Sequence, residues 1–396
     1  SARAQAFRAF CAAGGERLRL HALFEALQEQ FHRGDPAVWG WPAWPVPYRD
    51  PASAEVARFS QEHGEGVAFY QYLQWQANLQ LTAVGRRSYE LSLGVGLYQD
   101  LAVSIDRGGA EAWAGQALYA IDASIGAPPD PFNLKGQNWG LPPPIPGCLA
   151  DGAYASFVET LRANMQHCGA LRIDHVMALA RLYWIGGGSA EQGAYVHYPF
   201  DDLLAIVRLE SRRNCCLVIG EDLGTVPADL RQKLAAGGVL SCRLLYFERD
   251  GDGGFLAPQD YPAQALVAPT THDLPTLAGW WEGCDLELRT RLGLFPDEQQ
   301  RQRRVIERSQ DRARLLLALE REKLLPEGST VSPLSLPRMT AALAGALHRY
   351  LARSPAKIVL AQLEDVLGVR DQVNLPGTTD AHPNWRRTLP LALEGW

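Results

Sequence analysis

The chain has 396 residues, 47% of them hydrophobic, which is enough for one large domain or two to three smaller ones around a substantial core. A formal net charge of −6 and the absence of a basic run argue against a nucleic-acid binder. No apolar run approaches the ~20 residues that a membrane-spanning helix needs.

Residues 1 to about 90 are predicted to be helical. Apolar side chains recur at helical spacing along one stripe from Leu18 to Phe31 and along another from Val67 to Ala77. The interval between the two stripes is rich in tryptophan and proline, which indicates an ordered loop rather than a linker.

From Leu91 onward strand and helix patterns alternate, as is typical of a parallel α/β fold. Ser124–Ala150 is too long for a structural connection and is predicted to be a cleft-forming loop. A helix is predicted from about Tyr154 to His167, with Gly169 as its stop. Six strands are predicted, near Val95–Ala102, Leu171–His175, Cys216–Glu221, Leu240–Phe247, Leu266–Thr270 and Lys357–Leu363.

The third of these strands has the clearest pattern. Cys215–Ile219 lacks polar alternation, as is typical of a strand buried on both faces, and Glu221 and Asp222 follow it. Thr225 is predicted to be the N-cap of the next helix, with Pro227 in its first turn. Glu221 would then stand at the carboxyl end of a parallel strand, where α/β barrels place catalytic groups. Taken alone, it could equally be a solvated acid.

The same arrangement recurs at three other predicted strands. Short apolar runs lead into Asp100, into Asp174 and into Asp273. Because parallel strands end at the same edge of a sheet, the four carboxylates should meet at one end of the fold. This predicts a shared active site rather than scattered surface acids.

Several segments together resemble one enzyme family, the 4-α-glucanotransferases (amylomaltases or disproportionating enzymes) of glycoside hydrolase family 77, in the α-amylase clan. The resemblance covers essentially the whole chain. The segments that look like the family's strand-four, strand-five and strand-seven motifs are Leu171–His175, Ile219–Gly224 and Thr271–Thr276. The segments that look more specific to the family are Gly126–Asp130, Gly136–Gly140, Asn374–Thr378 and Asn384–Arg387.

The resemblance implies an α/β fold of the (β/α)8 TIM-barrel type with a helical insertion. Residues 1–90 would form the helical insertion subdomain, and residues 91–396 the catalytic barrel with strands three to eight. Strands one and two are then expected to be absent from this chain, which would be the C-terminal portion of a longer enzyme. The missing N-terminal segment is a possible partner.

Retaining cleavage of an α-1,4-glucosidic bond requires two carboxyl groups ~5–5.5 Å apart. Asp174 is assigned as the nucleophile, and Arg172, which shares its strand face, is expected to keep it ionised. Glu221 is assigned as general acid and then general base, a role that should require a raised pKa. Asp273 is expected to stabilise the transition state, and His272 to donate to the same sugar hydroxyls.

Five further residues are expected to bind substrate, each with an alternative. Asp100 matches the clan's strand-three carboxylate but could be structural, and His175 could contact substrate or brace Asp174. Trp139 could stack on a sugar ring or fill a loop core, and Gln137 lies in the same segment. Asn374 could bind a sugar hydroxyl or brace a turn. Asp222 is predicted to be a helix-start or loop anchor.

The predicted function is transfer of α-1,4-glucan segments between maltooligosaccharides. The alternatives are an α-glucan hydrolase of the same clan, or an inactive glucan-binding fragment if the N-terminal part is missing. The expected partners are maltooligosaccharides or other α-1,4-glucans, with no nucleic acid and no membrane. No cofactor or metal is expected, since no CxxC pair or HExxH helix occurs. The seven scattered cysteines favour a reducing, cytoplasmic location.

Overall fold

The computed structural model describes residues 1–129 and 135–395. The chain divides into two compact units. Unit 1 contains Ser1–Glu221 and Thr225–Leu230, and unit 2 contains Asp222–Gly224 and the chain from Arg231 onward. No helix among the described residues is both long enough and apolar enough to cross a membrane.

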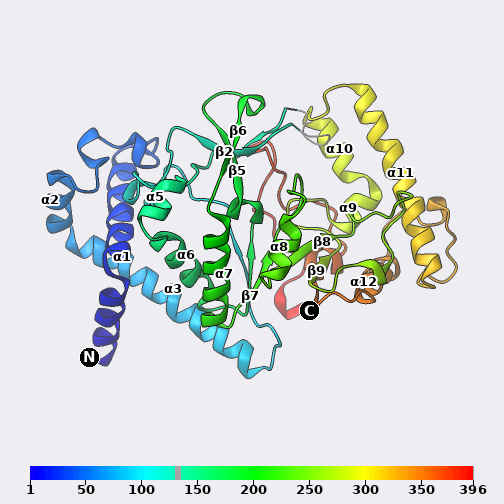
Figure 1. Cartoon of the computed structure of the whole chain (residues 1–396), viewed down its shortest axis with the longest axis horizontal. Helices are drawn as coiled ribbons and strands as arrows, with labels where there is room; N and C mark the ends of the chain where they lie inside the picture. The colour runs from blue at the N-terminus through cyan, green and yellow to red at the C-terminus, as the bar shows by residue number, and fades with distance from the viewer. Residues whose placement is uncertain (130–134, 396) are drawn as a thin grey trace. The chain divides into compact units, whose positions relative to one another are not determined.

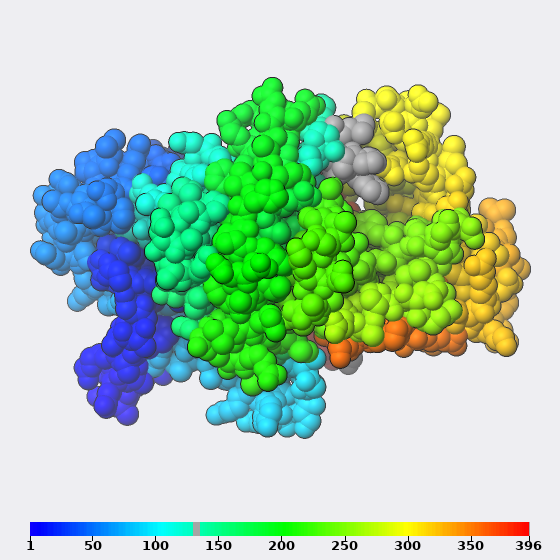
Figure 2. All heavy atoms as spheres, in the orientation of Figure 1, coloured from blue at the N-terminus to red at the C-terminus, as the bar shows by residue number. Residues whose placement is uncertain are grey.

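The first 90 residues of unit 1 are helical, as predicted. Helix α1 (Ala2–Gly34) packs against α3 (Gly64–Glu90), and the two cross in Figure 1. A non-helical Gly15 kinks α1, and its exposed first turns project from unit 1 in Figure 2 (dark blue). The interval between the helices is ordered, with Trp41 and Trp44 buried. It also contains a helix that was not predicted, α2 (Ala54–Glu62).

Three parallel strands of unit 1 lie in the order β1 (Tyr98–Leu101), β4 (Ala170–Ile173) and β7 (Leu217–Gly220). Helix α6 (Ala155–Met165) packs against β4, and α7 (Phe200–Asn214) packs against β7.

Gly169 does not stop α6, because that helix ends at the αR residue Gln166. A Cβ at Gly169 would instead lie only 1.6 Å from the Val95 carbonyl oxygen, so the glycine allows this close approach of two backbone segments.

A second sheet in unit 1 is antiparallel and was not predicted. Its order is β3 (Gln137–Asn138), β2 (Ser124–Ala127), β5 (Arg181–Ile185) and β6 (Ala194–His197). The stretch from 124 to 150, predicted to be one irregular loop, therefore contributes two strands, because they pair through the distant β5. The short helices α4 and α5 span Ala110–Ala114 and Pro146–Asp151.

Unit 2 contains three parallel strands in the order β8 (Leu240–Leu244), β9 (Ala265–Ala268) and β10 (Ile358–Val359). A core of aliphatic and aromatic side chains joins β9 to the surrounding helices, several of which are labelled in Figure 1. The helices span Leu230–Ala236 (α8), Leu277–Glu282 (α9), Cys284–Arg291 (α10), Glu298–Arg321 (α11), Ala341–Ala352 (α12) and Leu363–Val366 (α13). Short 3-10 helices of the two units lie at Trp41–Ala43, Val46–Tyr48, Val176–Leu179, Ala190–Gln192, Pro258–Asp260, Pro333–Ser335 and Leu393–Gly395.

All six predicted strands are present, and they form an α/β fold with parallel strands in both units. Two predictions about the chain around β7 were wrong. The strand begins at Leu217, because Cys215 has a left-handed backbone (φ 50°) and ends α7, and Leu217 is half-exposed. The following helix begins at Leu230, so Thr225 is not its N-cap; Gly224 (φ 82°) turns the chain first.

Candidate active site

Three candidate carboxylates of unit 1 lie at one edge of its parallel strands. Asp100 is in β1, Asp174 directly follows β4, and Glu221 directly follows β7. The backbone hydrogen bonds between these strands continue just past their ends. The Asp174 amide donates to the Leu101 carbonyl at 2.9 Å, and the Glu221 amide donates to the Ile173 carbonyl at 3.0 Å. Asp174 and Glu221 are therefore neighbours at the carboxyl ends of adjacent strands.

Arg172 joins two of these carboxylates. Its guanidinium donates to both oxygens of Asp100 at 2.7 Å and contacts Asp174 Oδ1 at 2.7 Å. The Arg172 side chain is only 9% exposed. Burial by itself would lower the pKa of Arg172, but the charges of Asp174, Asp100 and Glu221 outweigh it and raise that pKa above its ordinary value. Arg172 thus holds a permanent positive charge between the two carboxylates.

Glu221 is buried and held by the backbone of His175. Its Oε2 accepts the His175 amide at 3.0 Å, and its carbonyl accepts the Val176 amide at 2.9 Å. The chain turns here through His175, whose φ of 47° lies in the left-handed region. Burial, with a smaller effect of the Arg181 charge, lowers the pKa of His175 to about 4, so its ring is neutral near pH 7.

Trp139 lies beside His175 and is hydrogen-bonded to Gln137. The Trp139 ring meets the His175 ring edge-on at 5.2 Å between centroids, and its indole N–H donates to Gln137 Oε1 at 3.3 Å. Asp130, at the end of the segment that begins at Gly126, lies outside the described residues.

Unit 2 contains a second polar cluster, formed by the segment after β9 together with Asn374. Asp273 Oδ1 accepts the Asn374 side-chain amide at 2.6 Å, and His272 Nε2 lies 3.3 Å from Asp273 Oδ2. The Asn374 backbone amide donates to the His272 carbonyl at 3.2 Å. The fold therefore brings Asn374 to the adjacent residues His272 and Asp273, about one hundred positions earlier in the chain.

The sequence did not reveal the residues that support this cluster. Gln372 is buried, and its side-chain amide donates to the carbonyls of Asp273 at 2.9 Å and Asn374 at 2.7 Å. The buried His382 donates from Nε2 to the Gln372 carbonyl at 2.9 Å. No spacing pattern pointed to Gln372, and the only available signal was its position two residues before Asn374.

Asp222 acts as the expected loop anchor. It is completely buried, its Oδ2 accepts from Arg231 at 2.8 Å, and its Oδ1 accepts the Cys242 amide at 3.0 Å. This ties the residue after Glu221 to β8 and α8.

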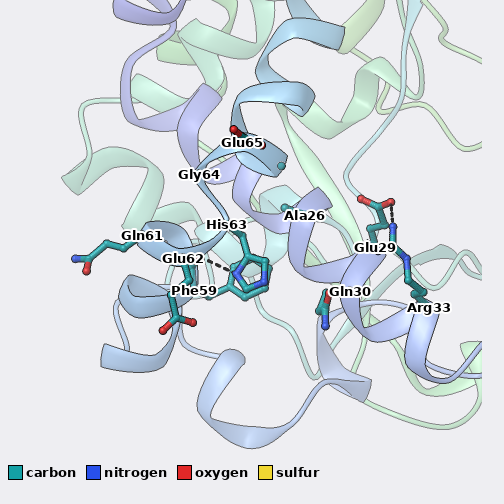
Figure 3. A pocket seen from close by; sticks show the side chains of 11 residues that line it. Ala26, Glu29, Gln30, Arg33, Phe59, Gln61, Glu62, His63, Gly64 and Glu65 are labelled. Carbon is teal, nitrogen blue, oxygen red and sulfur yellow. Dashed lines mark hydrogen bonds and ion pairs between the residues drawn. The ribbon is translucent and has the colours of Figure 1, made fainter.

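A cavity of about 800 Å³ lies among α1, α2 and α3, and contains none of the candidate catalytic residues. Figure 3 shows Glu29 and Arg33 on its wall pointing toward each other, with an ion-pair distance of 2.6 Å. His63 stacks on Phe59 at 4.1 Å. Because none of the candidate catalytic residues lines it, this cavity is not the candidate active site. Among the described residues, no group of three or more acidic, histidine or cysteine side chains is arranged to hold a metal ion.

Comparison with known proteins agrees with the motifs. Residues 1–392 match the family model of glycoside hydrolase family 77, described as 4-alpha-glucanotransferase. A 4-alpha-glucanotransferase of Haemophilus influenzae is 42% identical over 96% of this chain and 54% of its own length. One from Mycobacterium tuberculosis is 38% identical over 98% and 53%.

Among solved structures, amylomaltase from Corynebacterium glutamicum matches 98% of this chain and 53% of its own, with a TM-score of 0.85 and 32% identity. This chain thus spans about half the length of the relatives that it matches. The family match covers nearly all of its residues. The chain belongs to the 4-alpha-glucanotransferase family, glycoside hydrolase family 77.

Proposed function

We propose that this chain carries the catalytic groups of an enzyme that transfers α-1,4-glucan segments between maltooligosaccharides with retention of configuration. One observation carries the proposal: Asp174 and Glu221 follow adjacent parallel strands, and Arg172 pairs with Asp174. Adjacent strands lie ~4.8 Å apart. This spacing suits the ~5–5.5 Å between carboxyl groups that double displacement requires.

In the first step Asp174 attacks the anomeric carbon and forms a covalent glycosyl-enzyme, while Glu221 protonates the leaving glycosidic oxygen. In the second step Glu221 takes the proton from the 4-hydroxyl of an acceptor sugar. The oxygen of that hydroxyl attacks the anomeric carbon, and the bond to Asp174 breaks. Arg172 contributes positive charge beside Asp174 throughout. The His175 amide that binds Glu221 Oε2 fixes the direction of that carboxyl group.

The remaining candidates bind and orient the glucan. Asp273 binds sugar hydroxyls and stabilises the oxocarbenium-like transition state, and His272 donates to the same hydroxyls. The Asn374 amide, through its 2.6 Å contact, orients the Asp273 carboxylate. Asp100, His175, Trp139, Gln137 and Asn374 complete the substrate-binding set.

Each part of the chain corresponds to a part of the proposed enzyme. The six parallel strands correspond to strands three to eight of a (β/α)8 barrel, residues 1–90 to its helical insertion, and residues 91–396 to its catalytic part. All seven cysteines are free thiols, which suits a reducing, cytoplasmic compartment.

The test is incubation of the protein with maltotriose, followed by chromatography of the products. Transfer produces glucose together with a ladder of longer maltodextrins. If maltotriose is only shortened and no longer products form, the enzyme is a hydrolase rather than a transferase. If maltotriose binds but is not converted, only a glucan-binding role remains. A parallel incubation with the Asp174→Ala variant should yield neither product.

A further inference from the structure

Trp385 adopts a backbone conformation that is costly for a large side chain. Its φ is 58°, in the left-handed region that favours glycine. Two hydrogen bonds fix the chain at this point: Asn384 Oδ1 accepts the Leu375 amide at 2.8 Å, and the Trp385 amide donates to the Val373 carbonyl at 3.2 Å. Strain that is enforced by its surroundings is characteristic of functional positions.

The strained residue is not part of the hydrophobic core. Trp385 is 63% exposed, whereas the indoles of Trp280 and Trp281 in the same unit are buried. Its ring lies 4.9 Å from the His272 ring at a 48° angle. His272 in turn contacts Asp273, so the exposed indole borders the polar cluster of unit 2.

This combination suits a sugar ring. A glucose unit has an apolar face of C–H groups and a rim of hydroxyls, and an exposed indole offers a flat apolar surface with little conformational entropy to lose. Hydrogen-bonding groups beside that surface then receive the hydroxyls. His272, Asp273 and Asn374 are such groups.

We infer that Trp385 is a stacking platform for one glucose ring of the α-1,4-glucan that His272 and Asp273 bind. The inference rests on the proposed function, because it takes the ligand class from it. Trp385 contributes affinity for the glucan and no step of bond cleavage. Its removal therefore affects binding and KM and leaves kcat nearly unchanged.

Trp39 provides a matched control. It is also an exposed tryptophan, at 71%, but it lies in unit 1, where its ring packs edge-on against His32 at 5.6 Å. The experiment compares Trp385→Ala, Trp385→Phe and Trp39→Ala for melting temperature and for kcat and KM with maltotriose. Calorimetric titration with maltotriose in the Asp174→Ala background measures binding without turnover.

We expect Trp385→Ala to weaken maltotriose binding and raise KM about tenfold, with kcat within about twofold of wild type. Trp385→Phe should restore most of the affinity, and Trp39→Ala should match the wild type. Equal affinities for Trp385→Ala and Trp39→Ala would overturn the inference. If Trp385→Ala does not fold, the inference is tested by the quenching of tryptophan fluorescence on addition of maltotriose. This quenching should be smaller in Trp385→Phe than in wild type and unchanged in Trp39→Phe. A persistent quench in both would refute the platform.

The titration also separates this inference from the proposed function. If the wild type binds maltotriose but forms no ladder, transfer is wrong, while the Trp385 comparison still stands. If the ladder forms and the Trp385 variants bind like wild type, transfer stands and the platform is wrong.

Discussion

Replacing Asp365 by asparagine should change how the stability of the protein depends on pH. Asp365 lies in α13 and is 3% exposed. Its Oδ1 accepts the amide of Leu277, the first residue of α9, at 2.7 Å. Its Oδ2 is buried and has no hydrogen-bond partner within the part of the chain that the structure describes. A buried carboxylate with one unpaired oxygen resists ionisation.

Three effects set the pKa of Asp365. Burial raises it, the Leu277 amide lowers it, and the nearby Glu364 charge raises it slightly, with a net value of about 7. The adjacent Tyr246, whose hydroxyl donates to the Pro275 carbonyl, remains neutral because burial and the Asp365 charge raise its pKa well above the ordinary value.

The sign and size of the effect follow by linkage. Between the ordinary pKa of 3.8 and about 7, the folded protein keeps a proton on Asp365 that the unfolded chain has lost. The stabilising contribution is therefore complete below pH 4 and is lost as the pH rises to about 7. The difference between a pKa of 3.8 and one of about 7 corresponds to at most about 4 kcal/mol in the free energy of unfolding.

The assay is urea denaturation of wild type and Asp365→Asn at pH values from 4.5 to 8.5, at constant ionic strength. The free-energy difference, wild type minus variant, should fall through this range and level off above about pH 8. Asp371→Asn changes an exposed carboxylate of the same segment, which pairs with Arg387, and should shift the free energy of unfolding by well under ~1 kcal/mol. A difference that rises with pH would refute the reasoning, because it would mean that the fold favours the ionised carboxylate.

Three further predictions concern the proposed chemistry. Asp174→Ala should reduce turnover by several orders of magnitude and leave folding intact, as measured by product formation and circular dichroism; more than about a tenth of the activity would contradict the nucleophile assignment. Glu221→Gln should slow cleavage of unactivated maltooligosaccharides far more than cleavage of glycosyl fluorides, and equal losses in kcat/KM would exclude the acid role. Gln372→Glu places a carboxylate against the carbonyls of Asp273 and Asn374, so kcat should fall at least about tenfold, while Gln372→Met should lose less; identical rates for both variants would argue against this support.

The sequence by itself determined the parallel strands and the residues at their ends. Short apolar runs followed by a carboxylate are local patterns, and β1, β4, β7 and β9 form where those patterns occur. The shared face of Arg172 and Asp174 also follows from local geometry, because side chains two apart in a strand point the same way. The 2.7 Å contact between them agrees with this expectation.

Features that depend on distant partners could not be predicted in this way. The strands β2 and β3 are too short to show a periodicity, and they exist because β2 pairs with β5. The helix after Glu221 was placed too early because Thr225 and Pro227 form a plausible local start. The chain is instead turned at Gly224 and anchored through the buried Asp222.

The same distinction applies to the candidate site. The sequence identified Asp273 and Asn374 separately, but only the tertiary structure showed that the amide of one binds the carboxylate of the other. The support from Gln372 and the contact of the Trp385 ring with His272 also became visible only in the tertiary structure, because both join residues far apart in the chain. Hydrogen bonds and ring contacts across such separations depend on how the whole chain folds, whereas strand ends are encoded by a few neighbouring residues.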